Sequence, residues 1–434
     1  LRDCRKAIYT MNKVRVLQRG LYRAAKARKE RRFGVLYDKV YRDDILWLAW
    51  EKVRANKGSA GVDGQTIRDI EKAGVGQFLE GLTEELREKR YRPNRVRRTY
   101  IPKPGKQEKR PLGIPVIKDR VVQAAVKKVI EPIFEADFQP CSYGFRPKRD
   151  AHQAIEAVAK YVNYGCAQVI DADLKGYFDN IQHEKLMAVI ARRISDKWIL
   201  RLIRWWLEAG MMENDRITYS DTGVPQGGVI SPLLANIYLN ELDRRWTECG
   251  YNSIRYEAHL VRYADDMVIL CRKEVGRYYA EFKQEIERLG LELNEAKTRV
   301  VDAREGFDFL GMRLQYKRSR RGKMNCYKWP TPKAVSRVKE KVRRAIGRRG
   351  NWDLTEAIRR VNPILRGWGN YFRYGNSSEQ FDKVDRYVWW RLRWRYYVEH
   401  GKRRRGTRDF PRDLYEERGL YQLRGTVLRY GAAR

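Results

Sequence analysis

The sequence lacks any apolar run of about 18 residues, so we expect no membrane span. Its first residues carry no apolar signal region, and the absence of an initial methionine suggests that the printed chain starts inside a longer protein. Cysteine and histidine are scarce and show no metal-ligand spacing, so we expect reduced thiols in a cytoplasmic protein and no zinc site. The residues concerned are Cys4, Cys141, Cys166, Cys249, Cys271 and Cys326, with His152, His183, His259 and His400.

Acidic residues are too few to balance the basic ones. The chain has 92 Lys and Arg against 55 Asp and Glu, which gives a formal net charge of +37 over 434 residues. An excess of this size repels itself unless a polyanion shares it, and nucleic acid is the polyanion we expect. The 27 tyrosines and 12 tryptophans could also stack on bases.

Two adjacent acids, Asp265 and Asp266, stand between apolar runs at 259–261 and 267–271. This pattern predicts a β-hairpin with both acids at its tip. Neighbouring carboxylates repel each other, and a divalent cation with a preference for oxygen ligands, such as Mg²⁺, relieves the repulsion. A solvated turn is the alternative for any isolated pair of aspartates.

A second acidic stretch follows the apolar residues 167–170. Alternation along a strand would place Asp171 and Asp173 on one face, so either could supply a third metal ligand. The residues alone do not choose between them.

Residues 96–101 and 110–114 predict two strands joined by a turn, with Lys103 and Arg110 seven residues apart. Such cations could clamp a triphosphate, although two surface cations are equally expected in so basic a chain. Gln226 falls in a glycine-rich turn, where it could touch a nucleotide. Arg146 lies in a turn that is either buried between helices or faces nucleic acid.

Both ends of the chain are basic. Residues 1–40 hold thirteen Lys and Arg against three acids, and we interpret residues 1–45 as a helical arm on nucleic acid rather than a merely solvated helix. Residues 331–434 carry 27 basic and 11 acidic residues, look helical to about residue 400 and end in a basic tail at 402–405. We place a domain boundary near residue 325.

The motifs together resemble those of the reverse transcriptase/maturases encoded by group II introns. Tyr263-Ala264-Asp265-Asp266 resembles the YxDD box of reverse transcriptases, and the other motifs follow in the family's order along nearly the whole chain. They are Gly61-Val62-Asp63-Gly64, Ile101-Pro102-Lys103-Pro104, Ser142-Tyr143-Gly144-Phe145-Arg146-Pro147, Pro225-Gln226-Gly227-Gly228, Phe309-Leu310-Gly311 and, in the maturase region, Arg366-Gly367-Trp368-Gly369-Asn370-Tyr371-Phe372.

The resemblance implies a role for each matching residue. Asp265, Asp266 and Asp173 would bind two Mg²⁺ ions; Asp173 is chosen over Asp171 because the family's acid lies five residues before the aromatic that excludes a ribose 2′-hydroxyl, here Phe178. Lys103, Arg110 and Gln226 would contact the dNTP, and Lys297 would protonate pyrophosphate. Phe309, Leu310 and Gly311 would form the primer grip, and Arg146, Arg366 and Trp368 would contact template or intron RNA.

The fold that the resemblance implies is α+β: a right-hand polymerase followed by an α-helical thumb and maturase X domain. We expect a basic helical extension and the start of the fingers at 1–60, fingers and palm at 61–325, the thumb and X domain at 326–400, and a basic extension at 401–434. The chain shows no Cys pairs or His cluster for the family's HNH endonuclease domain.

The implied function is RNA-directed DNA synthesis on an RNA template and DNA primer, coupled to binding, splicing and mobility of a group II intron RNA. We expect a bacterial, cytoplasmic ribonucleoprotein, with a homodimer as one assembly to consider. The alternatives are a maturase that only assists splicing, and a reverse transcriptase serving host defence or CRISPR spacer acquisition.

Overall fold

The structure is a computed structural model that describes residues 2–102, 109–213, 216–253, 257–347, 353–399 and 417–428. It mixes helices with three small sheets, in agreement with the expected α+β class. The basic run at 402–405 lies outside the described residues. In the part of the chain that is described, no helix is both long and apolar enough to cross a membrane.

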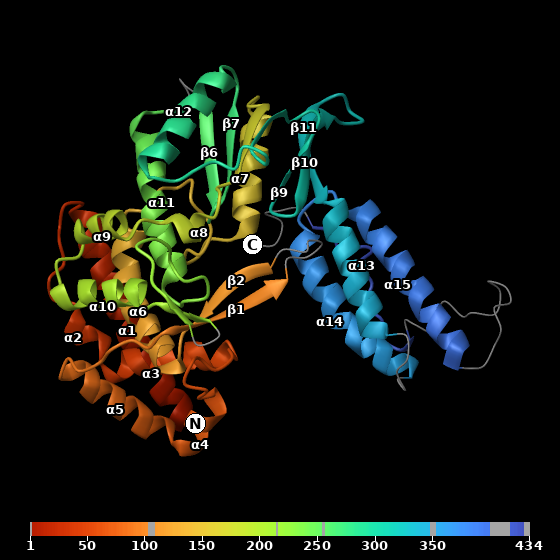
Figure 1. Ribbon diagram of the computed structural model, residues 1–434. Helices are drawn as coiled ribbons and strands as arrows, with labels where there is room; N and C mark the ends of the chain where they lie inside the picture. Colours follow the sequence, from red (N-terminus) through yellow and green to blue (C-terminus); the bar gives the residue numbers. More distant parts are fainter. Residues whose placement is uncertain are drawn as a thin grey trace.

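An N-terminal helical region packs around α6 (Ile117–Glu135), which is buried along most of its length. The apolar stripe of α1 (Arg2–Ala27), including Val14 and Ala25, faces α6, and most cations of its described side chains remain exposed. The other helices of this region are α2 (Tyr37–Val40), α3 (Asp43–Ala55), α4 (Ile67–Ala73), α5 (Val75–Arg87), α9 (His183–Ala191) and α10 (Lys197–Glu208). Figure 1 shows this region below the central sheet, with α1 to α6 in red to orange and α9 and α10 in yellow-green.

A small sheet, with strand order β2-β1-β4-β5, projects from this region. β1 (Val96–Pro102) and β2 (Lys109–Ile114) form an antiparallel hairpin, which confirms the two strands predicted from the sequence. β4 (Met211–Glu213) pairs in parallel with β1 and antiparallel with β5 (Arg216–Thr218). The sequence analysis did not predict this second hairpin, because three-residue strands carry too little alternation to stand out.

The central sheet has the order β6-β7-β3-β8, with every pair antiparallel. Its strands are β3 (Gln168–Ala172), β6 (Ala258–Tyr263), β7 (Asp266–Cys271) and β8 (Arg299–Asp302). Alternate residues bury on opposite faces. Ile170 and Ile269 join the core that includes α11 (Ser231–Glu248) and α12 (Val275–Arg288), whereas Val169 and Val268 face α7 (Ala151–Asn163). Burial on both faces explains why the central strand β7 is an almost continuous apolar run.

A third sheet, ordered β11-β10-β9, connects the central sheet to three C-terminal helices. Its strands are β9 (Phe307–Phe309), β10 (Met312–Arg318) and β11 (Met324–Pro330), and the helices are α13 (Pro332–Ile346), α14 (Leu354–Phe372) and α15 (Ser378–Glu399). Residue 325 falls inside β11, so the helical part starts slightly later than the boundary expected from the sequence. Figure 1 shows these helices in blue, beside the rest of the molecule.

Candidate active site

The β6–β7 hairpin presents two adjacent carboxylates at a tight turn. Tyr263 pairs with Asp266, so the turn consists of Ala264 and Asp265. Ala264 adopts a φ of 58°, a left-handed conformation that is costly for a residue with a side chain and must be held by its surroundings. The predicted hairpin with acids at its tip is confirmed; we call it the acidic hairpin.

A third carboxylate follows the neighbouring strand β3. Ala172 pairs with Met267, so Asp173 comes next along the register, beside Asp266. Burial raises the pKa of Asp266 to about 6, and the negative charges of Asp265 and Asp173 add to the rise. Asp266 still exposes surface at the turn, so its carboxylate remains accessible to a ligand. Three acids therefore interact electrostatically at one end of the sheet.

Asp171 lies two residues earlier on the same strand, opposite Val268. Burial raises its pKa to about 6, against the opposing charge of Arg299, whose guanidinium nitrogen lies 3.7 Å from the carboxylate. Among the charges that raise the pKa of Asp266, Asp173 acts more strongly than Asp171. The register, which places Asp173 beside Asp266 and Asp171 opposite Val268, is consistent with the prediction of Asp173 as the third acid.

Lys297 reaches the site from the segment between α12 and β8. Its Nζ lies 2.6 Å from Oδ2 of Asp173. The same segment is anchored to Asp173 through its backbone, because the Asn294 N–H donates to the Asp173 carbonyl and the Asp173 N–H donates to the Thr298 hydroxyl. The Lys297 ammonium is thus paired with the same Asp173 carboxylate that would bind a metal ion.

The donor set suits a hard cation, because closely spaced carboxylates are stabilised by positive charge. The side chains themselves are not drawn into a ligand cluster: within the described residues, no group of three acids, cysteines or histidines has a spacing that could hold a metal. The register nevertheless brings Asp173, Asp265 and Asp266 to the same end of the central sheet, and metal binding by these three acids stays a prediction.

A buried ion pair lies beneath the acidic hairpin. Arg262 and Asp243 are both fully buried, and Nε and a terminal nitrogen of Arg262 donate to the two carboxylate oxygens. The remaining nitrogen donates to Asn236 at 3.0 Å and to the Ala264 carbonyl at 2.9 Å. Asn236 in turn donates to the Gly144 carbonyl at 2.8 Å. The network ties the turn to α11 and to the loop before α7.

The sequence analysis missed this network, although a signal existed. Arg262 lies within an apolar strand that is buried on both faces. A cation in such a strand requires a buried anion as its partner. Only the fold identifies Asp243, on α11, as that anion.

The predicted nucleotide-binding residues that the structure describes lie on different elements: Arg110 on β2, Gln226 in the turn before α11 and Phe178 in a short helix. Arg110 is exposed on β2, and its charge opposes the rise in the pKa of both hairpin acids. The Gln226 carbonyl accepts from the Gly113 N–H, which fixes its turn against β2. Phe178, in α8 (Tyr177–Asn180), accepts at its carbonyl from the Val224 N–H of the same turn. Lys103 lies outside the described residues.

A cavity of about 250 Å³ adjoins this turn, lined by Gln226, Asp179 and Arg98 among other residues. Gly227 is required there, because it has a φ of 117° and an added Cβ would lie 2.4 Å from the Gly113 carbonyl oxygen. Close approach of the two backbones explains the glycine-rich turn.

The Phe309-Leu310-Gly311 motif forms the turn between β9 and β10. Leu310 and Gly311 both have positive φ values, 49° and 79°. The Tyr371 hydroxyl of α14 donates to the Leu310 carbonyl at 2.8 Å, and the His152 ring of α7 lies 2.6 Å from the Tyr371 carbonyl. A helix of the maturase-like segment therefore holds the predicted primer grip.

Arg146 takes the structural alternative that the sequence left open. Its side chain is 4% exposed and pairs with Glu135 at 2.7 Å. It also donates to the carbonyls of Gln139 and Ser142, so the guanidinium is engaged in holding its own loop. The prediction that Arg146 contacts template does not fit this burial.

The two maturase-region residues differ. Arg366 is exposed to solvent, although its guanidinium carbon lies 5.4 Å from the centroid of the Tyr421 ring. Trp368 packs against Phe372 and Phe381, with ring centroids 4.9 and 5.4 Å away. Trp368 thus contributes to packing of the helices, and Arg366 is the better candidate for RNA contact.

Two known protein families match parts of this chain. Residues 101–314 match the family described as reverse transcriptase (RNA-dependent DNA polymerase), and residues 335–410 match the group II intron, maturase-specific domain. The chain is therefore a reverse transcriptase, an RNA-directed DNA polymerase, followed by a maturase domain. It belongs to the group II intron reverse transcriptase/maturase family.

Several curated proteins are similar to the chain. Protein YkfC of Escherichia coli (strain K12) is 38% identical over 317 residues, which cover 64% of this chain and 82% of that protein. Group II intron-encoded protein LtrA of Lactococcus lactis subsp. cremoris is 37% identical over 214 residues, 49% of this chain but only 35% of LtrA. Maturase-like protein 1 of Euglena gracilis is 25% identical over 333 residues, 74% of this chain and 65% of that protein. These similarities favour an intron protein over the host-defence and CRISPR alternatives.

Proposed function

We propose that the chain folds as a right-hand polymerase that copies RNA into DNA for a group II intron. The N-terminal helices and the β2-β1-β4-β5 sheet would be the fingers, the central sheet the palm, and α13 to α15 the thumb and X domain. The observation that carries the proposal is the strand register, which places Asp173 at the end of β3 beside Asp266, next to Asp265 in the β6–β7 turn.

Asp173, Asp265 and Asp266 would hold two Mg²⁺ ions. When bound, such ions activate a primer 3′-hydroxyl and neutralise the departing pyrophosphate. The Lys297 ammonium is paired with the Asp173 carboxylate. A cation bound by Asp173 would displace this ammonium, which would then be free to donate a proton to the leaving pyrophosphate. We retain Asp173 over Asp171 as the third ligand.

Arg110, with Lys103 from the same hairpin, would bind the triphosphate, and Gln226 would contact the incoming dNTP. Phe178 would exclude the ribose 2′-hydroxyl. Its carbonyl and the Gln226 carbonyl anchor the same turn, which would fix the sugar contact relative to the nucleotide contact.

The primer grip would be Phe309, Leu310 and Gly311, supported by Tyr371. Beyond the polymerase site, the net charge of +37 and the maturase domain support binding of the intron RNA, whose splicing and mobility the protein would assist. We propose a bacterial cytoplasmic ribonucleoprotein, with homodimer formation to be measured directly.

Primer extension tests the proposal. With an RNA template, a DNA primer, dNTPs and Mg²⁺, the wild type should extend the primer and Asp265→Asn should lose at least a hundredfold in rate while binding RNA normally. Asp38→Asn, which removes an exposed acid whose partner is Lys39, is the control and should extend as wild type does. Normal extension by Asp265→Asn would show that the acidic hairpin is not the catalytic site.

A further inference from the structure

The β10–β11 ribbon ends in a strongly basic tip that the polymerase site does not use. Residues 312–330 contain seven Lys and Arg and no acid. Four of these cations gather at the tip, are exposed, and form no ion pair with any described residue; we call them the basic tip, and they are Arg318, Arg320, Arg321 and Lys323.

The tip is an ordered turn. The Ser319 N–H donates to the Lys323 carbonyl, the Gly322 N–H donates to the Ser319 carbonyl, and the Lys323 N–H donates to the Ser319 hydroxyl. Gly322 has a φ of 78°, which suits glycine in a tight turn. Four cations are therefore held together on a defined scaffold.

The ribbon itself is braced. One face packs on α7, and both backbone groups of Lys328, its N–H and its carbonyl, bond to Asn376 before α15. On the other face, the Lys317 ammonium lies 5.1 Å from the Tyr327 ring centroid and 4.9 Å from that of Trp329. The stem is thus held against two parts of the molecule, while its tip stays free.

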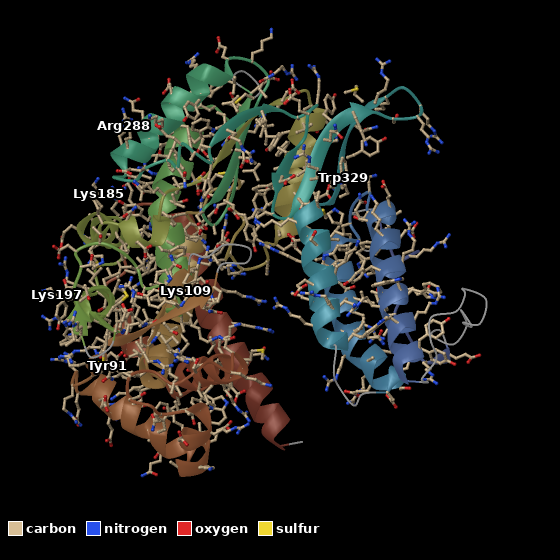
Figure 2. All side chains as sticks on the ribbon, turned by 45° about the vertical axis from the view of Figure 1, so that its right-hand side comes forward. Tyr91, Lys109, Lys185, Lys197, Arg288 and Trp329 are labelled. Atoms are coloured by element: carbon tan, nitrogen blue, oxygen red, sulfur yellow. The ribbon has the colours of Figure 1, made fainter. Side chains whose placement is uncertain are left out.

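The tip points away from the polymerase site. The predicted primer grip is the turn at the opposite end of β10, and seven residues at about 3.3 Å each put the tip roughly 20 Å from it. Figure 1 shows the ribbon extending beyond the helices, away from the turn between β6 and β7. Figure 2 shows Trp329 where the ribbon meets α13, at the end away from the tip.

A concentration of unpaired cations on a braced projection fits a polyanion, because phosphate contacts release counterions and supply most of the affinity for nucleic acid. We propose that the basic tip binds the phosphate backbone of a folded RNA that is distinct from the template–primer duplex. This inference rests on the proposed function, whose intron RNA would be such a partner. The tip then serves as a second RNA contact, independent of the catalytic carboxylates.

The test uses the full chain and a closed double-stranded RNA dumbbell of about 20 base pairs, which has no 3′ end to enter the polymerase site. The triple variant Arg320→Ala/Arg321→Ala/Lys323→Ala should bind it at least tenfold more weakly. The slope of log affinity against log salt should become shallower by about 2 to 3, since each lost phosphate contact removes almost one unit. Replacing the same two arginines and the lysine with Lys, Lys and Arg should retain binding.

The control triple variant, Arg68→Ala/Lys72→Ala/Arg87→Ala, removes the same charge from exposed positions on α4 and α5. It should bind the dumbbell as wild type does, and primer extension on a short template–primer should be unchanged in both triple variants. Unchanged dumbbell binding by the tip variant, or an equal loss in the control, would overturn the proposal. A parallel rise in the KM for template–primer would assign the tip to that duplex instead.

The polymerase assay separates the two proposals. Wild-type protein that binds the dumbbell through the tip but extends no primer would contradict the proposed catalysis alone. Wild-type protein that extends primers but does not bind the dumbbell would contradict the basic tip alone.

Discussion

Gly144 is the position where the packing makes the sharpest prediction for catalysis. A Cβ added there would lie 2.3 Å from the Ala264 nitrogen and 2.9 Å from the Tyr263 carbonyl carbon. Ordinary contacts begin at 3.4 Å, so Gly144→Ala must displace the turn or its own loop by about 1 Å. Both clashing atoms belong to the backbone, so a change of side-chain rotamer cannot relieve the clash.

A displacement of that size at Ala264 moves Asp265 and Asp266. A misplacement of about 1 Å in a reacting geometry can cost on the order of a hundredfold in rate, and overpacking typically costs about 1–3 kcal/mol of stability. We therefore expect Gly144→Ala to remain folded, to bind RNA, and to lose about a hundredfold in the rate of single-turnover primer extension.

The matched control is Gly81→Ala. Gly81 lies in α5, and an added Cβ would meet nothing within 4 Å. Alanine there should stabilise the protein by about 0.4–1 kcal/mol and leave extension unchanged. A Gly144→Ala variant that extends primers at the wild-type rate would refute the claim that this contact positions the catalytic turn.

Three further perturbations have definite expected outcomes. Asp243→Asn leaves the Arg262 cation buried without its anion and should cost about 3–5 kcal/mol in urea unfolding, and a loss below about 1 kcal/mol would contradict the burial of the pair. Tyr371→Phe removes the hydrogen bond to the Leu310 carbonyl and should raise the KM for template–primer while single-turnover chemistry changes little; an unchanged KM would separate α14 from the primer grip. Burial lowers the pKa of His259 to about 4, below the unfolded value, so protonation destabilises the fold as the pH drops from 7 to 5. The full shift corresponds to about 2 kcal/mol, which solvent screening at this half-buried ring reduces to about 1 kcal/mol; the wild type should lose that much more than His259→Phe, and equal losses in both would count against the shift.

The strands and hairpins that carry the candidate site could be predicted from local patterns, because they sit in short motifs with distinctive alternation and turns. The acidic hairpin, the β1–β2 hairpin and the apolar strand before Asp173 all follow from alternation and turn residues. The choice between Asp171 and Asp173 could not be made from the residues, since alternation treats them alike. In the structure the register places Asp173 beside Asp266 and Asp171 opposite Val268, and the two acids face different cations, Lys297 and Arg299; Asp173 as the third ligand stays a prediction.

What could not be predicted were contacts between distant segments. Arg146 and Arg262 are both buried arginines in motif-bearing stretches. Nothing in the sequence separates Arg146 from exposed arginines in so basic a chain, and the position of Arg262 within an apolar strand indicates a buried partner without identifying it. Their partners, Glu135 and Asp243, become neighbours only after the helices pack. Trp368 posed the same problem, because an aromatic in a basic helix fits base stacking and helix packing equally well.

The C-terminal helices share one apolar core with the face of the central sheet that packs against α7. Val169, Val268 and Leu270 of the sheet belong to the same buried cluster as Val342 of α13 and Leu392 of α15. Any rearrangement of these helices around bound RNA must therefore keep that cluster closed or expose apolar area beneath the acidic hairpin, at about 25 cal/mol for each Å². Whole-helix displacement is costly for this reason. Movement of the β9–β10 turn is the cheaper route by which RNA bound to the helices could alter the position of the primer. The turn is held by hydrogen bonds from the Tyr371 hydroxyl to the Leu310 carbonyl and from the Thr331 N–H to the Gly311 carbonyl.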